Sequence, residues 1–185
     1  MNRSDEILWI SQVVLLNDKR AFGRLMQRYH CRVRRYFLML TNGDRALSDD
    51  LAQTAFIRAW QGMNGFKMLS SFSTWLYRIA YNTTISALRR RPCNSVAIAE
   101  EILADTDDTL VDETLNNENE ELLQRLDRAI ALLSPEERAL VRLYHLEERS
   151  ISETAQITGL KENSVKVKLH RARKKLYILI KEQER

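Results

Sequence analysis

The hydrophobic positions of this 185-residue chain recur every three or four residues along most of its length. That period is typical of helices with one buried face. The chain holds only five glycines and two prolines, so few turns are available and an all-α fold is predicted. The repeating positions predict helices over residues 4–16, 18–42, 48–60, 73–88, 118–133, 134–146, 150–159 and 162–176.

Local signals predict where the N-terminal helices begin. Ser48 and Ser73 precede apolar periodic segments and are the predicted N-caps of the third and fourth helices, because a serine hydroxyl can accept a hydrogen bond from a free backbone N–H there. This start places Asp49 and Asp50 in the first turn of the third helix, where the helix dipole favours acidic groups. Both aspartates therefore have a structural explanation.

The last two predicted helices form a tight pair. Ser150 and Glu153 have the spacing of a capping box, and Gly159 can adopt the positive φ that ends the first helix of the pair. In the second helix the apolar residues share one face, and the basic residues project away from it. The apolar positions are Val165, Leu169, Ala172 and Leu176, and the basic ones are Lys166, Lys168, Arg171, Arg173, Lys174 and Lys175.

This pattern is typical of a recognition helix that lies in the major groove of DNA with phosphates on either side. The alternative is an ordinary solvated amphipathic helix. A solvated face usually mixes both signs of charge, whereas Glu162 is the only acidic residue from Lys161 to Lys175. The sequence therefore favours nucleic-acid binding.

Charge divides the chain into three blocks. Residues 1–91 hold fifteen basic against six acidic residues, residues 92–121 hold none against ten, and residues 122–185 hold fourteen against nine. The net charges of +9, −10 and +5 predict two modules that face nucleic acid and an acidic connector that does not bind the same polyanion. Residues 93–119 also lose the helical period, which predicts an extended or disordered tether. Whether the two modules pack together or stay apart is left open.

The fourth predicted helix places aromatic residues beside polar and basic ones. Trp75, Tyr77, Arg78 and Asn82 suit stacking on unpaired bases and hydrogen bonding to their edges. The alternative is that the two aromatic residues belong to the core. For Trp75 this alternative is favoured, because it lies one residue from the apolar seam of its helix.

Catalytic and metal-binding patterns are missing from the sequence. It has no glycine-rich phosphate loop, CxxC pair or HExxH motif, and His30, His145 and His170 are far apart. We therefore expect no enzyme activity, no metal and no cofactor. Cys31 and Cys93 do not make a disulfide framework, and neither an export leader nor an apolar run of membrane-spanning length is evident. A cytoplasmic location is expected.

Four segments resemble bacterial RNA polymerase sigma factors of the extracytoplasmic-function group, which keeps only the second and fourth sigma domains. Residues 49–60 resemble the helix that binds the polymerase clamp, and residues 72–82 resemble the promoter-melting segment. Residues 133–138 and 163–173 resemble the opening and the recognition helix of the fourth domain. The resemblance implies sigma domain 2 over residues 1–91, an acidic flexible linker over 92–118 and a helix-turn-helix sigma domain 4 over 119–185.

The resemblance also implies a function and the residues that perform it. The expected function is transcription initiation, in which the chain binds core RNA polymerase, recognises and melts the minus-ten element of promoter DNA, binds the minus-thirty-five element and is controlled by an anti-sigma factor. The implied polymerase-binding residues are Asp49, Asp50, Gln53, Phe56 and Ile57. The implied minus-ten residues are Lys67, Met68, Leu69, Ser70, Ser71, Arg78 and Asn82. The implied minus-thirty-five residues are Glu162, Asn163, Ser164, Lys166, Lys168, Arg171 and Lys174.

Two departures from the family pattern, and two other functions, stay open at this point. Lys161 stands before the recognition helix where a capping serine, threonine or aspartate is frequent, so the start of that helix can shift. The loop over residues 67–71 varies with promoter specificity, which leaves the accepted base undetermined. The other functions are a stand-alone helix-turn-helix regulator with two-fold symmetric sites and a nucleic-acid-modifying enzyme.

Overall fold

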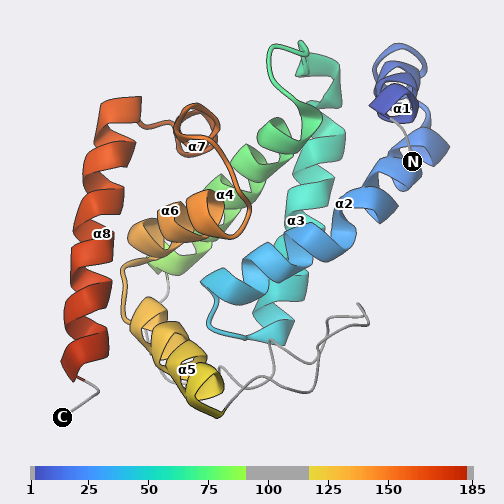
Figure 1. Cartoon of the computed structure of the whole chain (residues 1–185). Coiled ribbons are helices and arrows are strands. Elements are labelled where there is room, and N and C mark those ends of the chain that lie inside the picture. The colour runs from blue at the N-terminus through green and yellow to red at the C-terminus, as the bar shows by residue number, and fades with distance from the viewer. Residues whose placement is uncertain (1–2, 91–116, 183–185) are drawn as a thin grey trace.

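The structure is a computed structural model that describes residues 3–90 and 117–182 (Figure 1). Most of the predicted tether lies outside these ranges. The described residues form only helices, which confirms the all-α class. The elements are α1 (Arg3–Leu16), α2 (Lys19–Leu40), α3 (Arg45–Gly62), the 3-10 turn η1 (Met63–Gly65), α4 (Phe72–Arg90), α5 (Asn117–Ala131), α6 (Pro135–His145), α7 (Ile151–Thr158) and α8 (Glu162–Glu182).

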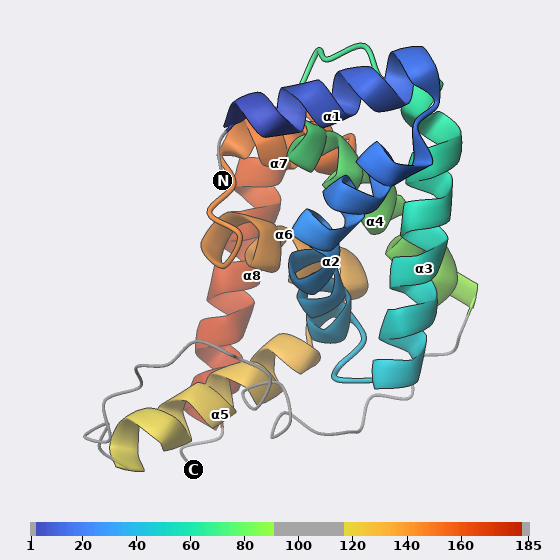
Figure 2. The same cartoon turned by 90° about the vertical axis from the view of Figure 1, so that its right-hand side faces the viewer.

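Helix α4 lies at the centre of the molecule. It packs against α2 and α3 on one side and against α6 and α7 on the other (Figure 1). Figure 2 shows α1 crossing the top of the molecule, and in Figure 1 α8 lies at the edge opposite α1, packed on α5, α6 and α7. None of the described helices is long and apolar enough to cross a membrane.

The third helix begins earlier than the sequence predicted. The Asp44 carboxylate accepts a hydrogen bond of 2.9 Å from the Leu47 backbone N–H, so Asp44 is the N-cap and α3 begins at Arg45. Ser48, the predicted cap, is buried and donates its hydroxyl to the Asp44 carbonyl at 2.6 Å. The prediction was wrong because an aspartate four residues upstream caps as well as a serine. Asp49 and Asp50 consequently lie beyond the first turn.

The fourth helix also has a different cap. Its first residue is Phe72, and the Ser71 hydroxyl accepts a hydrogen bond of 3.1 Å from the Thr74 backbone N–H. A capping side chain reaches the N–H group three residues ahead, so Ser71 does what was predicted for Ser73. Ser73 lies instead in the first turn, and its hydroxyl is free to bond elsewhere.

The start and stop signals of the C-terminal helices are confirmed. Ser134 and Ser150 both form capping boxes, and Gly159 ends α7 with a φ of 75°. Helix α8 begins at Glu162, directly after Lys161, whose ammonium group cannot accept a hydrogen bond from the first backbone N–H groups. The helix predicted over residues 134–146 ends one residue earlier, at His145, and Leu146 directly after it is exposed.

The two halves of the chain share one hydrophobic core. Ala139 and Leu143 of α6 and Ile157 of α7 are fully buried in the same cluster as the core side chains of α2, α3 and α4. A second cluster joins α5, α6, α7 and α8. The modules predicted from charge are therefore packed against each other, which decides between the two arrangements that the sequence left open.

Two buried arginines complete the contact between α2 and α6. The Arg138 guanidinium donates to the Leu40 carbonyl at 2.9 Å and to the Asn42 side-chain oxygen. Arg142 lies 3.0 Å from the Met39 sulfur and 3.3 Å from an Asp127 carboxylate oxygen. The C-terminal end of α2 is thus held by hydrogen bonds from the following module.

Removing a side chain from the shared core tests this packing. Ile157 is 0% exposed, so Ile157→Ala is expected to lower the free energy of unfolding by about 2–5 kcal/mol through lost burial and a cavity. Urea denaturation followed by circular dichroism measures the change. Ile178→Ala is the matched control because Ile178 is 47% exposed, and we expect a change of about 0.5 kcal/mol or less. Equal effects of the two substitutions would contradict the shared core.

Candidate nucleic-acid interface

The loop between η1 and α4 is held at both ends and exposed in the middle. Phe66 and Phe72 are buried, and their rings lie 5.9 Å apart in an edge-to-face contact. Between them, Lys67, Met68 and Leu69 are exposed, Leu69 to 89%. Exposed apolar side chains beside a lysine, on a loop anchored in the core, can contact both the faces of bases and a phosphate.

Met68 adopts an unusual backbone conformation at the tip of this loop. Its φ is 54°, in the left-handed region that side chains with a Cβ adopt rarely. Strain of this kind persists only where the surrounding structure imposes it, and it is concentrated at functional sites. Asn17, Asn42 and Glu148 also have a positive φ, so this conformation describes the tip of the loop but does not by itself identify a binding element.

Two polar side chains extend the loop surface along α4. Arg78 and Asn82 are exposed and lie four residues apart, on the same face of the helix. A guanidinium and an amide can hydrogen bond to phosphates and to base edges. All seven predicted minus-ten residues therefore belong to one loop and the helix that follows it.

The aromatic residues of α4 belong to the core. Trp75 is partly buried, and its ring centroid lies 5.0 Å from that of Phe66 and 5.7 Å from that of Phe72. Tyr77 is fully buried, with its ring 5.2 Å from that of Tyr36. The core alternative favoured for Trp75 is thus confirmed, and Tyr77 is covered as well.

The predicted polymerase-binding residues divide between the surface and the core. Asp50, Gln53 and Ile57 are exposed at helical spacings on one face of α3, and Ile57 is 51% exposed although it is apolar. Asp49 lies 2.7 Å from the Arg34 guanidinium in an ion pair. Phe56 is only 4% exposed and packs in the core, so it supports this face from beneath.

Helix α8 presents the second candidate surface. Its apolar residues Val165, Leu169, Ala172 and Leu176 are buried as the periodicity predicted, and its other side faces away from the molecule (Figure 1). The first turns expose Glu162, Asn163, Ser164 and Lys166.

Part of the positive charge of α8 is paired with acidic residues of α6. Lys168 lies 3.2 Å from Glu136, and Lys175 lies 3.4 Å from Glu137. Hydrogen bonds from Arg89 and from Lys168 hold the pKa of Glu136 below its ordinary value. Lys166, Arg171 and Lys174 are exposed and make no ion pair with the described part of the chain. Among the predicted minus-thirty-five residues, these three are the cations without an ion pair in the described part of the chain.

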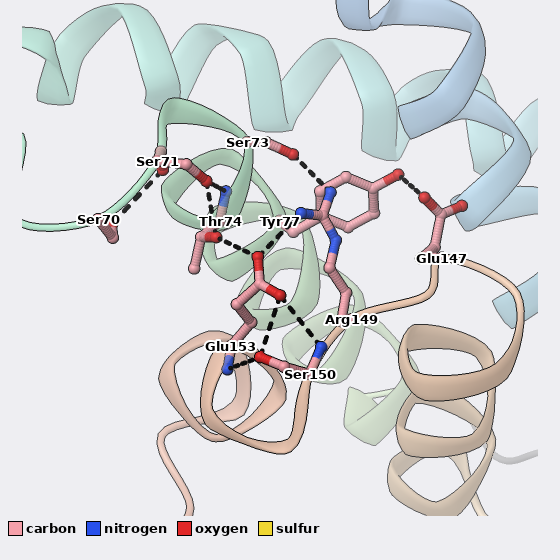
Figure 3. A network of polar contacts seen from close by, with 9 residues as sticks. All are labelled: Ser70, Ser71, Ser73, Thr74, Tyr77, Glu147, Arg149, Ser150 and Glu153. Atoms are coloured by element: carbon pink, nitrogen blue, oxygen red, sulfur yellow. Dashed lines mark hydrogen bonds and ion pairs between the residues drawn. The ribbon is translucent and has the colours of Figure 1, made fainter.

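A polar network joins the first turn of α4 to the segment before α7 (Figure 3). The Tyr77 hydroxyl donates to a Glu147 carboxylate oxygen at 2.5 Å, and the Thr74 hydroxyl donates to Glu153 at 3.4 Å. Arg149 donates to the Ser73 hydroxyl at 2.5 Å and to Glu153 at 3.4 Å. The charged members of this network were missed by the sequence analysis, because nothing distinguishes them from other surface charges before the two modules are brought together.

The protonation state of Tyr77 follows from its surroundings. Burial, and then the negative charge of Glu147, raise the pKa of Tyr77 well above its ordinary value. The hydroxyl therefore stays protonated and donates to the carboxylate. The Arg149 guanidinium lies 4.9 Å from the centre of the Tyr77 ring, in a cation–π contact.

Family models match both modules. The model described as sigma-70 region 2 matches residues 25–92, and the model described as sigma-70 region 4 matches residues 123–176. The first range contains α4 with its loop, and the second contains α7 and α8 as far as Leu176. The matches therefore cover both candidate surfaces.

Curated relatives match along nearly the whole chain. The ECF RNA polymerase sigma factor SigM of Mycobacterium tuberculosis is 32% identical over 178 residues, which are 96% of this chain and 85% of that protein. The ECF RNA polymerase sigma-E factor of Escherichia coli is 35% identical over 167 residues, or 84% of each chain.

Two solved structures share the fold. CnrH in complex with the cytosolic domain of CnrY has a TM-score of 0.69 at 23% identity and covers 97% of this chain and 99% of that one. The sigma factor RpoE of Bartonella quintana, in complex with the anti-sigma factor NepR, has a TM-score of 0.65 at 24% identity. The match covers 86% of this chain and 96% of that one. Together with the sequence matches, these findings show that the chain belongs to the ECF family of RNA polymerase sigma factors, non-enzymatic initiation factors that direct the polymerase to promoters.

Proposed function

We propose that this chain recognises promoters through two surfaces, one on the domain over residues 1–91 and one on the domain over residues 119–185, joined by a linker over residues 92–118. The observation that carries the proposal is that each surface is exposed and rests on buried residues of its own helix. The first is the loop over residues 67–71 with Arg78 and Asn82, and the second is the outward face of α8. The separation of the two surfaces fits a promoter with two separated elements.

The first surface is proposed to bind the opened minus-ten element. Lys67, Met68, Leu69, Ser70 and Ser71 form an anchored loop that can hold an unstacked base against apolar side chains. Arg78 and Asn82 follow on α4 and can hydrogen bond to neighbouring nucleotides. Binding the unpaired strand more tightly than the duplex favours melting, so no covalent step is required.

The second surface is proposed to bind the minus-thirty-five element as a duplex. The N-terminal residues of a recognition helix contact base edges, which is the place of Glu162, Asn163 and Ser164 in α8. Lys166, Lys168, Arg171 and Lys174 follow along the helix and suit phosphates. Duplex binding at this surface would position the first surface on the strand that opens.

The exposed face of α3 is proposed to dock on core RNA polymerase. Asp50, Gln53 and Ile57 combine an acidic, an amide and an apolar side chain on one rigid helix, with Asp49 beside them and Phe56 beneath. The resemblance of residues 49–60 to the clamp-binding helix of the family supports this assignment. The proposed location is the cytoplasm, where polymerase and promoter are found.

An anti-sigma factor is the proposed regulator. RpoE of Bartonella quintana, whose fold this chain shares, was solved in complex with one. No small-molecule substrate and no membrane insertion are part of the proposal.

Run-off transcription with core polymerase on a promoter library tests the function. We expect initiation from a promoter set that core polymerase alone, or with another sigma factor, does not use. Unchanged initiation sites in the presence of the chain would reject the proposal.

The paired and unpaired cations of α8 give a second test. Arg171→Ala should weaken binding to a duplex minus-thirty-five element. The slope of log K against log salt concentration should become less steep by about 0.9, as expected when one phosphate contact is lost. Lys168→Ala should also reduce the affinity and its salt dependence, but by a smaller amount, because Lys168 is already paired with Glu136 at 3.2 Å. Fluorescence anisotropy across a series of salt concentrations measures both, and Lys181→Ala near the far end of α8 is the control. An unchanged slope in Arg171→Ala would mean that this face is only solvated.

The polymerase-docking face can be tested independently of DNA. Asp50→Ala combined with Gln53→Ala should weaken co-purification with core polymerase about tenfold or more, because two exposed polar contacts are lost. Helix content should not change, since neither side chain is buried. Gln61→Ala, on an exposed position near the end of α3, is the control. Normal recovery of polymerase with the double variant would refute this face.

A further inference from the structure

We propose that Tyr144 and His145 of α6, together with Arg173 of α8, are positioning residues for recognition of the minus-thirty-five element. They fix how α8 is turned on the helices beneath it, and so where its first turn meets the bases. None of the three is among the residues predicted to contact this element. The inference rests on the proposed function of α8 and adds the residues that orient it.

The Arg173 side chain is held by two consecutive residues at the end of α6. Its Nε donates to His145 Nε2 at 3.3 Å, and its guanidinium carbon lies 5.4 Å from the centre of the Tyr144 ring. The Tyr144 and His145 rings contact each other edge to face, with their centroids 4.9 Å apart. The three side chains therefore form one contact between the end of α6 and the middle of α8.

This contact requires a neutral imidazole. Burial, and then the positive charge of Arg173, lower the pKa of His145 below its ordinary value. A neutral imidazole has one acceptor nitrogen, so near neutral pH Nε2 accepts the hydrogen bond from Arg173. The partly buried Tyr144 packs against the core cluster of the C-terminal helices and adds a cation–π contact. Arg173 is thus held without an ion pair to an acidic residue of the described helices.

Arg173 lies on the opposite flank of α8 from the two lysines that pair with α6. Successive residues are about 100° apart around a helix, so the residues directly before and directly after a buried position lie on different flanks. Arg173 follows the buried Ala172, whereas Lys168 and Lys175 each precede a buried leucine. The polar contacts with α6 therefore border the apolar seam of α8 on both sides.

The two flanks contact opposite ends of α6. The lysine flank reaches Glu136 and Glu137 in the first turn of α6, and the Arg173 flank reaches His145, its last residue. In Figure 1 the two helices run in different directions, so α8 lies across α6. Apolar burial is non-directional and by itself resists rotation of α8 only weakly. Hydrogen bonds are directional, and contacts at both ends of the crossed helix fix this rotation.

The rotation of α8 decides which of its groups meet base edges. Glu162, Asn163 and Ser164 lie in its first turn, about three turns before Arg173. Groups that read bases must be held within roughly 0.5 Å and 10–20° of the productive geometry. Attraction to phosphates is largely electrostatic and tolerates more movement. Releasing Arg173 should therefore reduce sequence discrimination and leave general binding to DNA almost unchanged.

Run-off transcription by the full chain in complex with core polymerase tests the proposal, on promoters whose minus-thirty-five or minus-ten element is separately scrambled. At about pH 8 the His145 ring is neutral, so His145→Ala leaves the net charge unchanged. This variant should lose about tenfold of the preference for the intact minus-thirty-five element, as when one base contact is lost. The preference for the intact minus-ten element should change less than about twofold. His145→Gln, whose amide oxygen can accept from Arg173, should keep both preferences.

Further variants separate positioning from other roles. Arg173→Ala should lose the same preference as His145→Ala, and the double variant should lose no more, because both substitutions break one contact. His30→Ala, which removes the same kind of side chain from α2 in the other module, should change neither preference. Urea denaturation measures whether each variant is as stable as the unaltered chain. Binding of His145→Ala to a random duplex should keep its salt dependence, since no phosphate contact is lost.

The possible results are distinct. A loss of the minus-thirty-five preference in His145→Ala that His145→Gln recovers, at an unchanged urea midpoint, supports the proposal. An unchanged preference in His145→Ala overturns it, and this is the result expected if Arg173 only contacts a phosphate. A loss that His145→Gln does not recover, or that follows a lowered midpoint, also overturns it. If scrambling the minus-thirty-five element has no effect on the unaltered chain, the proposed function of α8 is itself rejected.

Discussion

The burial of α4 between the two modules is the constraint on which the rest of the structure depends. Leu76, Tyr77 and Ala80 are buried where α2 and α3 meet α6 and α7, so this helix is fixed from both sides. Only the remaining strip of its surface, which carries Arg78 and Asn82, is exposed. The rigid core thereby holds the residues proposed to read the minus-ten strand, and these residues are exposed although α4 is covered from both sides.

Two contributions to the free energy oppose each other in the contact between the modules. Apolar burial around Leu143 and Ile157 stabilises the closed arrangement, as it does in any protein core. The charged network beside it is only partly satisfied, since Glu147 keeps a buried carboxylate oxygen without a hydrogen bond. The two contributions oppose each other within one interface, and the larger apolar one keeps α6 and α7 packed on α4.

Most of the local structure could be predicted from the sequence, because period and capping are local properties. The helices, the capping boxes at Ser134 and Ser150 and the turn at Gly159 are all confirmed, as are the family resemblance and the absence of enzymatic function in that family. The predicted N-caps Ser48 and Ser73 were wrong, because several neighbouring residues can cap a helix and intrinsic propensity alone does not choose among them. The packing of α6 and α7 on α4 could not be predicted, since periodicity shows that a helix face is buried but not what covers it.

The charges of α8 show why composition alone overstates a binding surface. Six basic residues point away from its apolar seam, yet Lys168 and Lys175 are held by Glu136 and Glu137 of α6. Glu136 also accepts a hydrogen bond from Arg89 of α4 at 2.8 Å, so one carboxylate links the recognition helix to the first module. Among the predicted minus-thirty-five residues, Lys166, Arg171 and Lys174 are therefore the cations that no acidic residue of the described part of the chain pairs with, whereas Lys168 has to leave Glu136 before it can contact a phosphate.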